Sequence, residues 1–247
     1  MLYFRKNEIG GIALFKDIQK YKCGLIIPLY ALIYLPWFAF LEKTVQVPAH
    51  LIHMALDDYI PFVEIFVIPY MLWFAYISVT VLYFLRKDRN EFYRLMIFLI
   101  IGMTVFLIVS TVYPNGHDLR PAAFDHSNIF TRMIQRLYST DSPNNILPSI
   151  HVFNSLGAWF AIHNSRFLKE KKGIRLSAFI LTCLIILSTV FIKQHSVLDV
   201  FLAFLMAGVL YPVFYRQQSP VFYRNLLAKI REHKPAKAKR IKGDSPL

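Results

Sequence analysis

"YRLMIFLIIGMTVFLIVSTVY", residues 93–113, is the stretch that decides the fold. Arg94 is its only charged residue, and the run has the length of a helix that crosses the ~30 Å hydrocarbon core of a bilayer. A backbone inside lipid has no water to bond, so it must satisfy its own N–H and C=O groups, as an α-helix does. The stretch therefore predicts a membrane-spanning helix.

Five further apolar runs of similar length lie before and after it. The chain of 247 residues is 56% hydrophobic and 17% charged, whereas charged residues make up about a quarter of a typical soluble domain. These features predict an all-α fold, a polytopic integral membrane bundle of six helices. We expect it to occupy residues 24–216, between an N-terminal segment of residues 1–23 and a tail of residues 217–247. The six runs are Gly24–Leu41, Phe62–Leu85, Tyr93–Tyr113, Ile146–His163, Ile174–Ile192 and Val197–Tyr215.

Positive charge is unevenly distributed between the two sides of the predicted bundle. The formal net charge is +13, and most of the 28 Lys and Arg residues lie in the terminal segments and in the loops on their side. Such residues favour the cytoplasmic side, so we expect a multi-pass protein of the cell membrane with both termini in the cytoplasm. Ser149–His151 and Gln194–Asp199 then face the non-cytoplasmic side.

The terminal segments indicate contact with the membrane surface. Residues 1–22 mix apolar and basic side chains, which predicts an interfacial amphipathic helix, and no cleavage site follows, so the first span is expected to be a retained anchor. The basic tail is expected to touch anionic lipid head groups. Its Lys-rich run lacks stacking aromatic residues, which argues against nucleic-acid binding. Cys23 and Cys183 predict no disulfide framework, and we assign both to packing.

"KQHSVLDV", Lys193–Val200, places His195 and Asp199 four residues apart, so they share one face if the segment is helical. A carboxylate that accepts the Nδ1–H of an imidazole leaves Nε2 with a lone pair, ready to act as a nucleophile or base. Taken alone, such a pair is more typical of a polar contact that holds two helices together.

"LPSIHV", Leu147–Val152, has the features of a helix start. Pro148 suits the first helical position, and the N–H groups that follow it, with the Ser149 hydroxyl, form an anion site. His151 beside an anion would keep its proton, which suits a general acid. The alternative is a serine N-cap followed by an incidental interfacial histidine.

"DLRPAAF", Asp118–Phe124, contributes Arg120, whose planar guanidinium binds phosphate well, although a single arginine is more often a solvated loop residue. All three segments lie at the outer ends of predicted helices. Together they supply what phosphoryl transfer needs: a nucleophile, an acid for the leaving group, and positive groups around the phosphate oxygens.

These segments resemble the three signature segments of the type-2 phosphatidic acid phosphatase superfamily. That pattern runs Lys-x6-Arg-Pro, then Pro-Ser-Gly-His, then Ser-Arg-x5-His-x3-Asp. The resemblance implies a six-helix membrane enzyme without a metal or other cofactor, which transfers phosphate through a phosphohistidine. It implies that His195 is the nucleophile, Asp199 its orienting partner and His151 the general acid. It also implies that Arg120 and Ser149 hold the phosphate, with Ser188 at the start of the third segment.

Three positions depart from this pattern. Tyr113 stands at the expected lysine, Thr189 at the expected arginine and Ile150 at the expected glycine, and Lys193 is our candidate to replace one lost cation. The "STDSPNNILPSIH" stretch and "LDDYIPFVEIFVIPY", Leu56–Tyr70, are more similar to the branch that includes inositol phosphorylceramide synthases. Those enzymes move a phosphorylated head group between lipids.

The leading hypothesis is therefore a hydrolase that acts on a lipid phosphate or diphosphate at the outer face. We favour hydrolysis because the site is expected to be open to water. Head-group transfer to a lipid alcohol is the alternative, and a non-catalytic transporter or assembly factor is a further class. A metal hydrolase that uses His151, His195 and Asp199 ranks last, because a nearby arginine disfavours a cation. The remaining loop histidines match no metal-ligand spacing. These histidines are His50, His53, His117 and His126.

Overall fold

The structure is a computed structural model that describes residues 22–45, 47–124 and 126–216. The predicted basic tail, residues 217–247, lies outside this part of the chain, as does nearly all of the predicted interfacial helix of residues 1–22. The expected division of the chain at residues 23 and 217 therefore stays a prediction.

Helices make up nearly all of the regular structure, which confirms the all-α prediction. The membrane-sized helices alternate with short helices and two short strands at one end of the bundle. The elements are η1 (Lys22–Leu25), α2 (Ile26–Thr44), β1 (His50–Leu51), α3 (Ala55–Tyr59), η2 (Glu64–Phe66), α4 (Val67–Lys87), α5 (Arg89–Val112), β2 (Asn115–Gly116), α6 (Ile129–Thr140), α7 (Ile150–Asn164), α8 (Lys172–Phe191) and α9 (Val197–Tyr215).

Five helical segments in the described part of the chain are long and apolar enough to cross a membrane, which makes this a multi-pass membrane protein. They are Cys23–Thr44, Glu64–Lys87, Arg89–Val112, Lys172–Phe191 and Val197–Tyr215. The fourth expected span differs, because α7 starts only at Ile150 and has 15 residues, about 22 Å at 1.5 Å per residue. It is packed against α4, α5, α8 and α9. Most of its surface therefore contacts protein, whereas the other long helices each have a side that contacts lipid.

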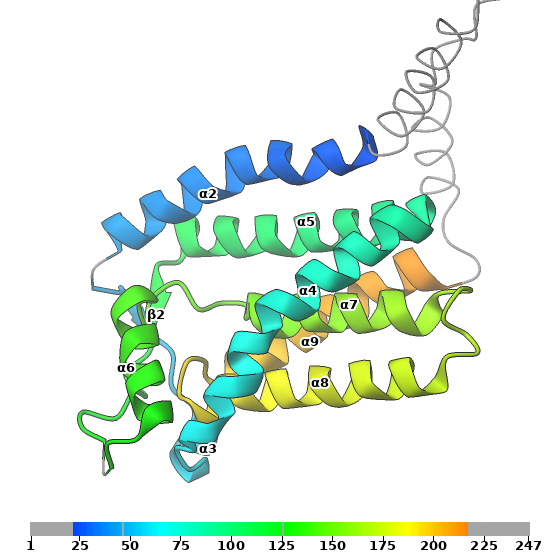
Figure 1. The fold of residues 1–247 in the computed structure, drawn as a ribbon. Coiled ribbons are helices and arrows are strands. Elements are labelled where there is room, and N and C mark those ends of the chain that lie inside the picture. The colour runs from blue at the N-terminus through cyan, green and yellow to red at the C-terminus, as the bar shows by residue number, and fades with distance from the viewer. Residues whose placement is uncertain (1–21, 46, 125, 217–247) are drawn as a thin grey trace, which may run out of the picture.

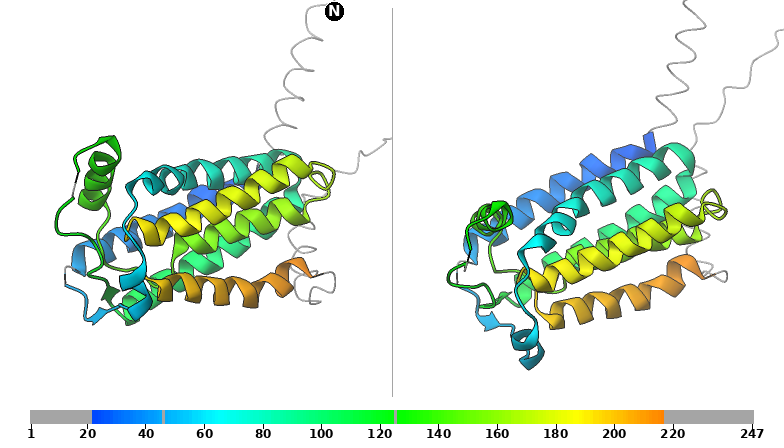
Figure 2. Two further views of the ribbon diagram at one scale, coloured as in Figure 1. Left: turned by 90° about the horizontal axis from the view of Figure 1, so that it is seen from below. Right: turned by 60° about the horizontal axis from the view of Figure 1, so that its bottom comes forward.

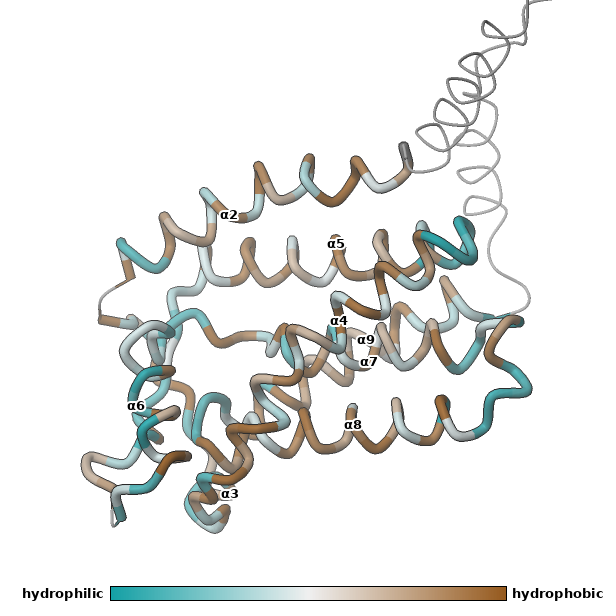
Figure 3. Tube along the Cα trace, in the orientation of Figure 1, coloured by the Kyte–Doolittle hydropathy of each residue, from teal (hydrophilic) through white to brown (hydrophobic). Residues whose placement is uncertain are grey.

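The helices form a bundle with α7 near its centre and α2 at its edge, where α2 packs on α5 (Figure 1). The views in Figure 2 show that α2 begins and α9 ends at the same end of the bundle. The helix α6, the two strands and the short α3 lie at the opposite end. Apolar residues dominate the long helices, and hydrophilic ones gather at the ends and on α6 (Figure 3).

A close approach of α5 and α7 sets the position of the central helix. A Cβ added at Gly102 would lie 2.0 Å from an edge carbon of the Phe153 ring, so only glycine fits there. The Phe153 ring also stacks on Phe98, with 4.6 Å between ring centroids. Because Phe153 follows His151 by two residues, this packing holds the first turn of α7 in place.

The end of the bundle that carries α3 and α6 is tied together by loop contacts. Strands β1 and β2 pair in parallel, with His50 opposite Asn115. The side chain of Asn115 accepts hydrogen bonds from the N–H groups of Ile146 and Leu147, just before α7. In α6, Ile134 is fully buried against α4 and the end of α8. This cover encloses the polar segments that precede α7 and α9.

Candidate active site

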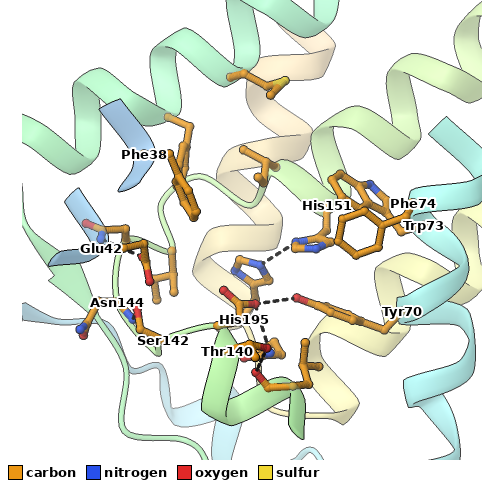
Figure 4. Close-up of a pocket in the computed structure, with 18 of the residues that line it drawn as sticks. Phe38, Glu42, Tyr70, Trp73, Phe74, Thr140, Ser142, Asn144, His151 and His195 are labelled. Atoms are coloured by element: carbon orange, nitrogen blue, oxygen red, sulfur yellow. Dashed lines mark hydrogen bonds between the residues drawn. The ribbon is translucent and has the colours of Figure 1, made fainter. Parts of the chain in front are cut away.

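A cavity of about 470 Å³ opens at this end of the bundle, between α2, α4, α5, α6 and α7. Its walls are largely aromatic and aliphatic, and its polar groups come from the last turn of α2, the end of α6 and the loop that follows. The imidazoles of His151 and His195 both reach it, as Figure 4 shows. Apolar walls with a few convergent polar groups are typical of a small-molecule site.

His195 lies in the turn between α8 and α9. The N–H groups of Gln194 and His195 both donate to the carbonyl of Thr189, which folds the turn back onto the end of α8. Ser196 is the N-cap of α9, so His195 stands one residue before the N-cap. His195 is therefore not on the helix, whereas the spacing of His195 and Asp199 had suggested that both lie on one helical face. Asp199 still reaches it, because its carboxylate folds back toward the N-cap.

The carboxylate of Asp199 orients the His195 ring. Its Oδ2 lies 3.2 Å from His195 Nδ1 and also accepts the N–H of Ser196 at 2.9 Å. Since a carboxylate only accepts, Nδ1 carries the proton and Nε2 keeps its lone pair. Burial and the nearby charge of Arg120 lower the pKa of His195 to about 3, which keeps the ring neutral. A neutral imidazole with a free Nε2 is a competent nucleophile.

His151 faces His195 from the first turn of α7. Its Nδ1 lies 3.4 Å from His195 Nε2, so the proton between the two rings belongs to His151. Two aromatic rings fix its orientation, Tyr70 at 4.5 Å and Trp73 at 4.4 Å between centroids. The two histidines are 44 residues apart in sequence, and the structure brings them to one point.

The start of α7 differs in detail from the prediction. The N-cap is Ser149, whose hydroxyl accepts the N–H of Val152, and Pro148 precedes the helix instead of opening it. The N–H of Ser149 donates to the carbonyl of Asp199 at 3.3 Å, which joins the two signature segments directly. Ser149 is fully buried and lies beside the cavity without lining it.

Arg120 supports the cavity wall from behind. Its guanidinium donates to the Asp141 carbonyl at 2.7 Å and to the side-chain oxygen of Gln194, and it stacks 4.2 Å over the Tyr138 ring. Gln194 and Asp141 line the cavity, whereas Arg120 does not. Its positive charge therefore acts on the site from one layer away.

The other two predicted phosphate-binding residues, Lys193 and Ser188, do not line the cavity either. Lys193 has a positive φ of 51°, and its ammonium donates to the carbonyls of Asp57 at 2.7 Å and Ile60 at 2.6 Å. Its ammonium group therefore holds the end of α3. Ser188 is buried in α8, where its hydroxyl donates to the carbonyl of Ile185.

Asp57 is a functional candidate that the sequence did not single out. Its carboxylate is buried, at 2% exposure, and accepts the hydroxyl of Ser196 at 2.6 Å, the N–H of Val197 at 2.8 Å and the N–H of Met54 at 2.9 Å. It therefore caps α9 from α3 and holds the turn that carries His195. The only signal in the sequence was two adjacent aspartates in an otherwise apolar stretch.

Two of the other loop histidines, His117 and His53, connect the outer loops. His117 is buried and bonds the carbonyl of Gln194 at 3.1 Å through Nε2, while His53 bonds Asp58 and Asp118 at the surface. Within residues 22–45, 47–124 and 126–216, no group of three His, Cys, Asp or Glu side chains is arranged to hold a metal ion.

Comparison with known proteins identifies one match. The family model of the PAP2 superfamily matches residues 118–223, the region that contains Arg120, His151, His195 and Asp199. No curated protein and no solved structure matches the chain.

Proposed function

Because the chain belongs, through residues 118–223, to the PAP2 superfamily of type-2 phosphatidic acid phosphatases, we propose that it cleaves a lipid-linked phosphoester through a phosphohistidine. Members of this superfamily are generally phosphatases or phosphotransferases. The observation that carries the proposal is the line of three side chains, Asp199, His195 and His151, at a cavity large enough for a phosphorylated head group.

The first step uses both histidines. A phosphate in the cavity replaces the direct contact between the two rings. The lone pair of His195 Nε2 attacks phosphorus, and the bond from phosphorus to the lipid oxygen breaks. His151, which the bound phosphate anion holds in its doubly protonated form, gives its Nδ1 proton to that oxygen and becomes neutral. Asp199 stabilises the positive charge that develops on His195, as a buried carboxylate does for a catalytic imidazole.

In the second step, water attacks the phosphohistidine, and His151 takes the proton of the water. Hydrolysis is the outcome we propose, with transfer to an alcohol as the alternative that differs only in the attacking group. We propose that Arg120 and the N-terminal end of α7 at Ser149 offset the charge on the phosphate oxygens.

The lipid part of the substrate has a path to the site. Among the residues that line the cavity, Leu35 of α2 and Met71 and Phe74 of α4 are exposed on the surface of the bundle that faces lipid. We propose that an acyl chain lies between these helices while the phosphate reaches His195. With both termini in the cytoplasm, the cavity stands on the non-cytoplasmic side of the membrane.

The test is turnover by the purified protein in detergent against a panel of lipid phosphates and phospholipids, with products identified by mass spectrometry. His195→Ala should abolish turnover, and the control His163→Ala, an exposed histidine at the other end of the bundle, should retain it. Equal turnover by His195→Ala and the unmodified protein would refute the phosphohistidine. Loss of turnover in a chelator would favour a metal hydrolase instead.

A further inference from the structure

The charge around the cavity does not suit a phosphate monoester. No lysine or arginine is among the described residues that line it, whereas two acidic residues, Glu42 and Asp141, are. Burial raises the pKa of Asp141 to about 6, so near neutral pH this side chain is largely charged as well. Arg120 behind the wall offsets one negative charge.

The positions that could add positive charge are committed elsewhere. Tyr113, where the superfamily pattern has lysine, stacks on the His50 ring with 3.8 Å between centroids. Thr189, where the pattern has arginine, donates its hydroxyl to a carbonyl of its own helix. Lys193 is bound to α3. A phosphate monoester, whose second pKa is near 6, would bring close to two negative charges into these surroundings, but a phosphodiester brings one.

One residue that lines the cavity carries a buried hydrogen-bond acceptor with no partner among the described residues. Asn145 is 5% exposed and lines the cavity, and its Oδ1 accepts no hydrogen bond from residues 22–45, 47–124 or 126–216. Its Nδ2 donates to Glu42 Oε1 at 3.2 Å, and since a carboxylate only accepts, this fixes which amide atom is the oxygen. The backbone holds the residue in place, with a φ of 54° and its N–H bonded to the carbonyl of Asn115.

We infer that the substrate is a phosphodiester lipid whose head group donates hydrogen bonds to Glu42 and Asn145. This inference rests on the proposed function and narrows its substrate. A buried, unpaired acceptor is costly, and a ligand hydroxyl or ammonium group satisfies it. Figure 4 shows Glu42 on one side of His195 and His151 with Trp73 on the other.

This arrangement decides which bond breaks. His151 is packed against aromatic residues of α4, so the oxygen that it protonates belongs to the lipid alcohol. Attack by His195 Nε2 breaks the bond from phosphorus to the diacylglycerol oxygen, and diacylglycerol leaves with the proton of His151. The phosphate stays on His195 with its head group attached. Water then releases the head group as its phosphate monoester, or an alcohol accepts it.

The experiment compares four lipids that share one leaving group. Phosphatidic acid is the monoester, phosphatidylcholine is a diester without donors, phosphatidylglycerol offers hydroxyl donors and phosphatidylethanolamine offers an ammonium donor. The rate of diacylglycerol release is measured for the unmodified protein and for His195→Ala. We expect one or both donor-bearing diesters to react at least about tenfold faster than phosphatidic acid and phosphatidylcholine. Phosphatidic acid brings one more negative charge near a carboxylate, and phosphatidylcholine offers no donor to Glu42 and Asn145.

A charge-removing variant tests the subsite itself. Glu42→Gln should lower the donor-bearing diester rate about tenfold and raise the phosphatidic acid rate, while the matched control Glu170→Gln, at the other end of the bundle, should leave the ratio of the two rates unchanged. Faster His195-dependent cleavage of phosphatidic acid would overturn the inference and leave the proposed function intact, as would an unchanged ratio in Glu42→Gln. If no cleavage of any of the four lipids depends on His195, the proposed function itself fails.

Discussion

The contact between α3 and the catalytic turn makes a sharp prediction for Asp57→Asn. The carboxylate accepts three hydrogen bonds, from Ser196, Val197 and Met54, and an amide has one oxygen with which to accept them. At least one N–H group then meets the amide NH₂. Hydrogen bonds to a charged group contribute about 1.5–3 kcal/mol each, so the loss of one or two of them should lower the free energy of unfolding by roughly 3 kcal/mol.

The same change should slow the reaction more than it weakens binding. Asp57 holds the turn of His195 without lining the cavity, and a misplacement of about 1 Å lowers rates by up to roughly 100-fold. We expect kcat to fall between about tenfold and 100-fold with KM nearly unchanged, measured as steady-state product release in detergent. Thermal unfolding of the same samples gives the stability change.

Asp58→Asn is the matched control, because it changes the next residue of the same helix. The Asp58 side chain is 64% exposed and bonds the side chain of His53 at the surface, so little change in kcat or stability is expected. If Asp57→Asn and Asp58→Asn have the same kcat and the same unfolding temperature, the assigned role of Asp57 is wrong.

Three further changes test separate parts of the structure. Asp199→Asn should lower kcat by about 10²–10⁴-fold. The amide can turn its NH₂ to His195 Nδ1, which selects the tautomer with the proton on Nε2 and removes the lone pair that attacks phosphorus. An unchanged kcat would contradict the orienting role of Asp199. Gly102→Ala should destabilise the bundle by at least about 1–3 kcal/mol through the Phe153 clash, whereas Gly208→Ala, with open space around it, should not, as thermal unfolding will show. Asp141 has a folded-state pKa raised from 3.8 to about 6, so its contribution to stability is present at low pH and lost as the pH rises through 6. Asp141→Asn should therefore remove roughly 3 kcal/mol from the change in unfolding free energy between pH 4 and 7. The same pH profile of unfolding in Asp141→Asn and the unmodified protein would refute this role of Asp141.

The long helices were predictable because length and apolar composition alone decide them in lipid. The exception is α7, and its cause was visible in the sequence: Ser149 is a typical N-cap and Pro148 cannot extend the helix backwards with a normal hydrogen bond. The buried surroundings of α7 depend on its neighbours, and no single segment contains that information.

The candidate site was predictable where residues lie in short local patterns. The contact between Asp199 and His195 spans four residues, and the spacing alone suggested it. Asp57 contacts Ser196 across 139 residues, so only the fold reveals the contact. The direction of Lys193 depends on a backbone with positive φ, which neither residue type nor spacing indicates.

Direct detection of phosphorus on a histidine is the most decisive measurement for the proposed mechanism. Purified protein is mixed with its lipid substrate, quenched in alkali because phosphohistidine is unstable in acid, and digested, and the modified peptide is located by mass spectrometry. We predict that His195 carries the phosphate, with or without its head group, and that His151 does not. Turnover with the modification on His151, or with no modified histidine under conditions that trap the intermediate, would contradict the mechanism.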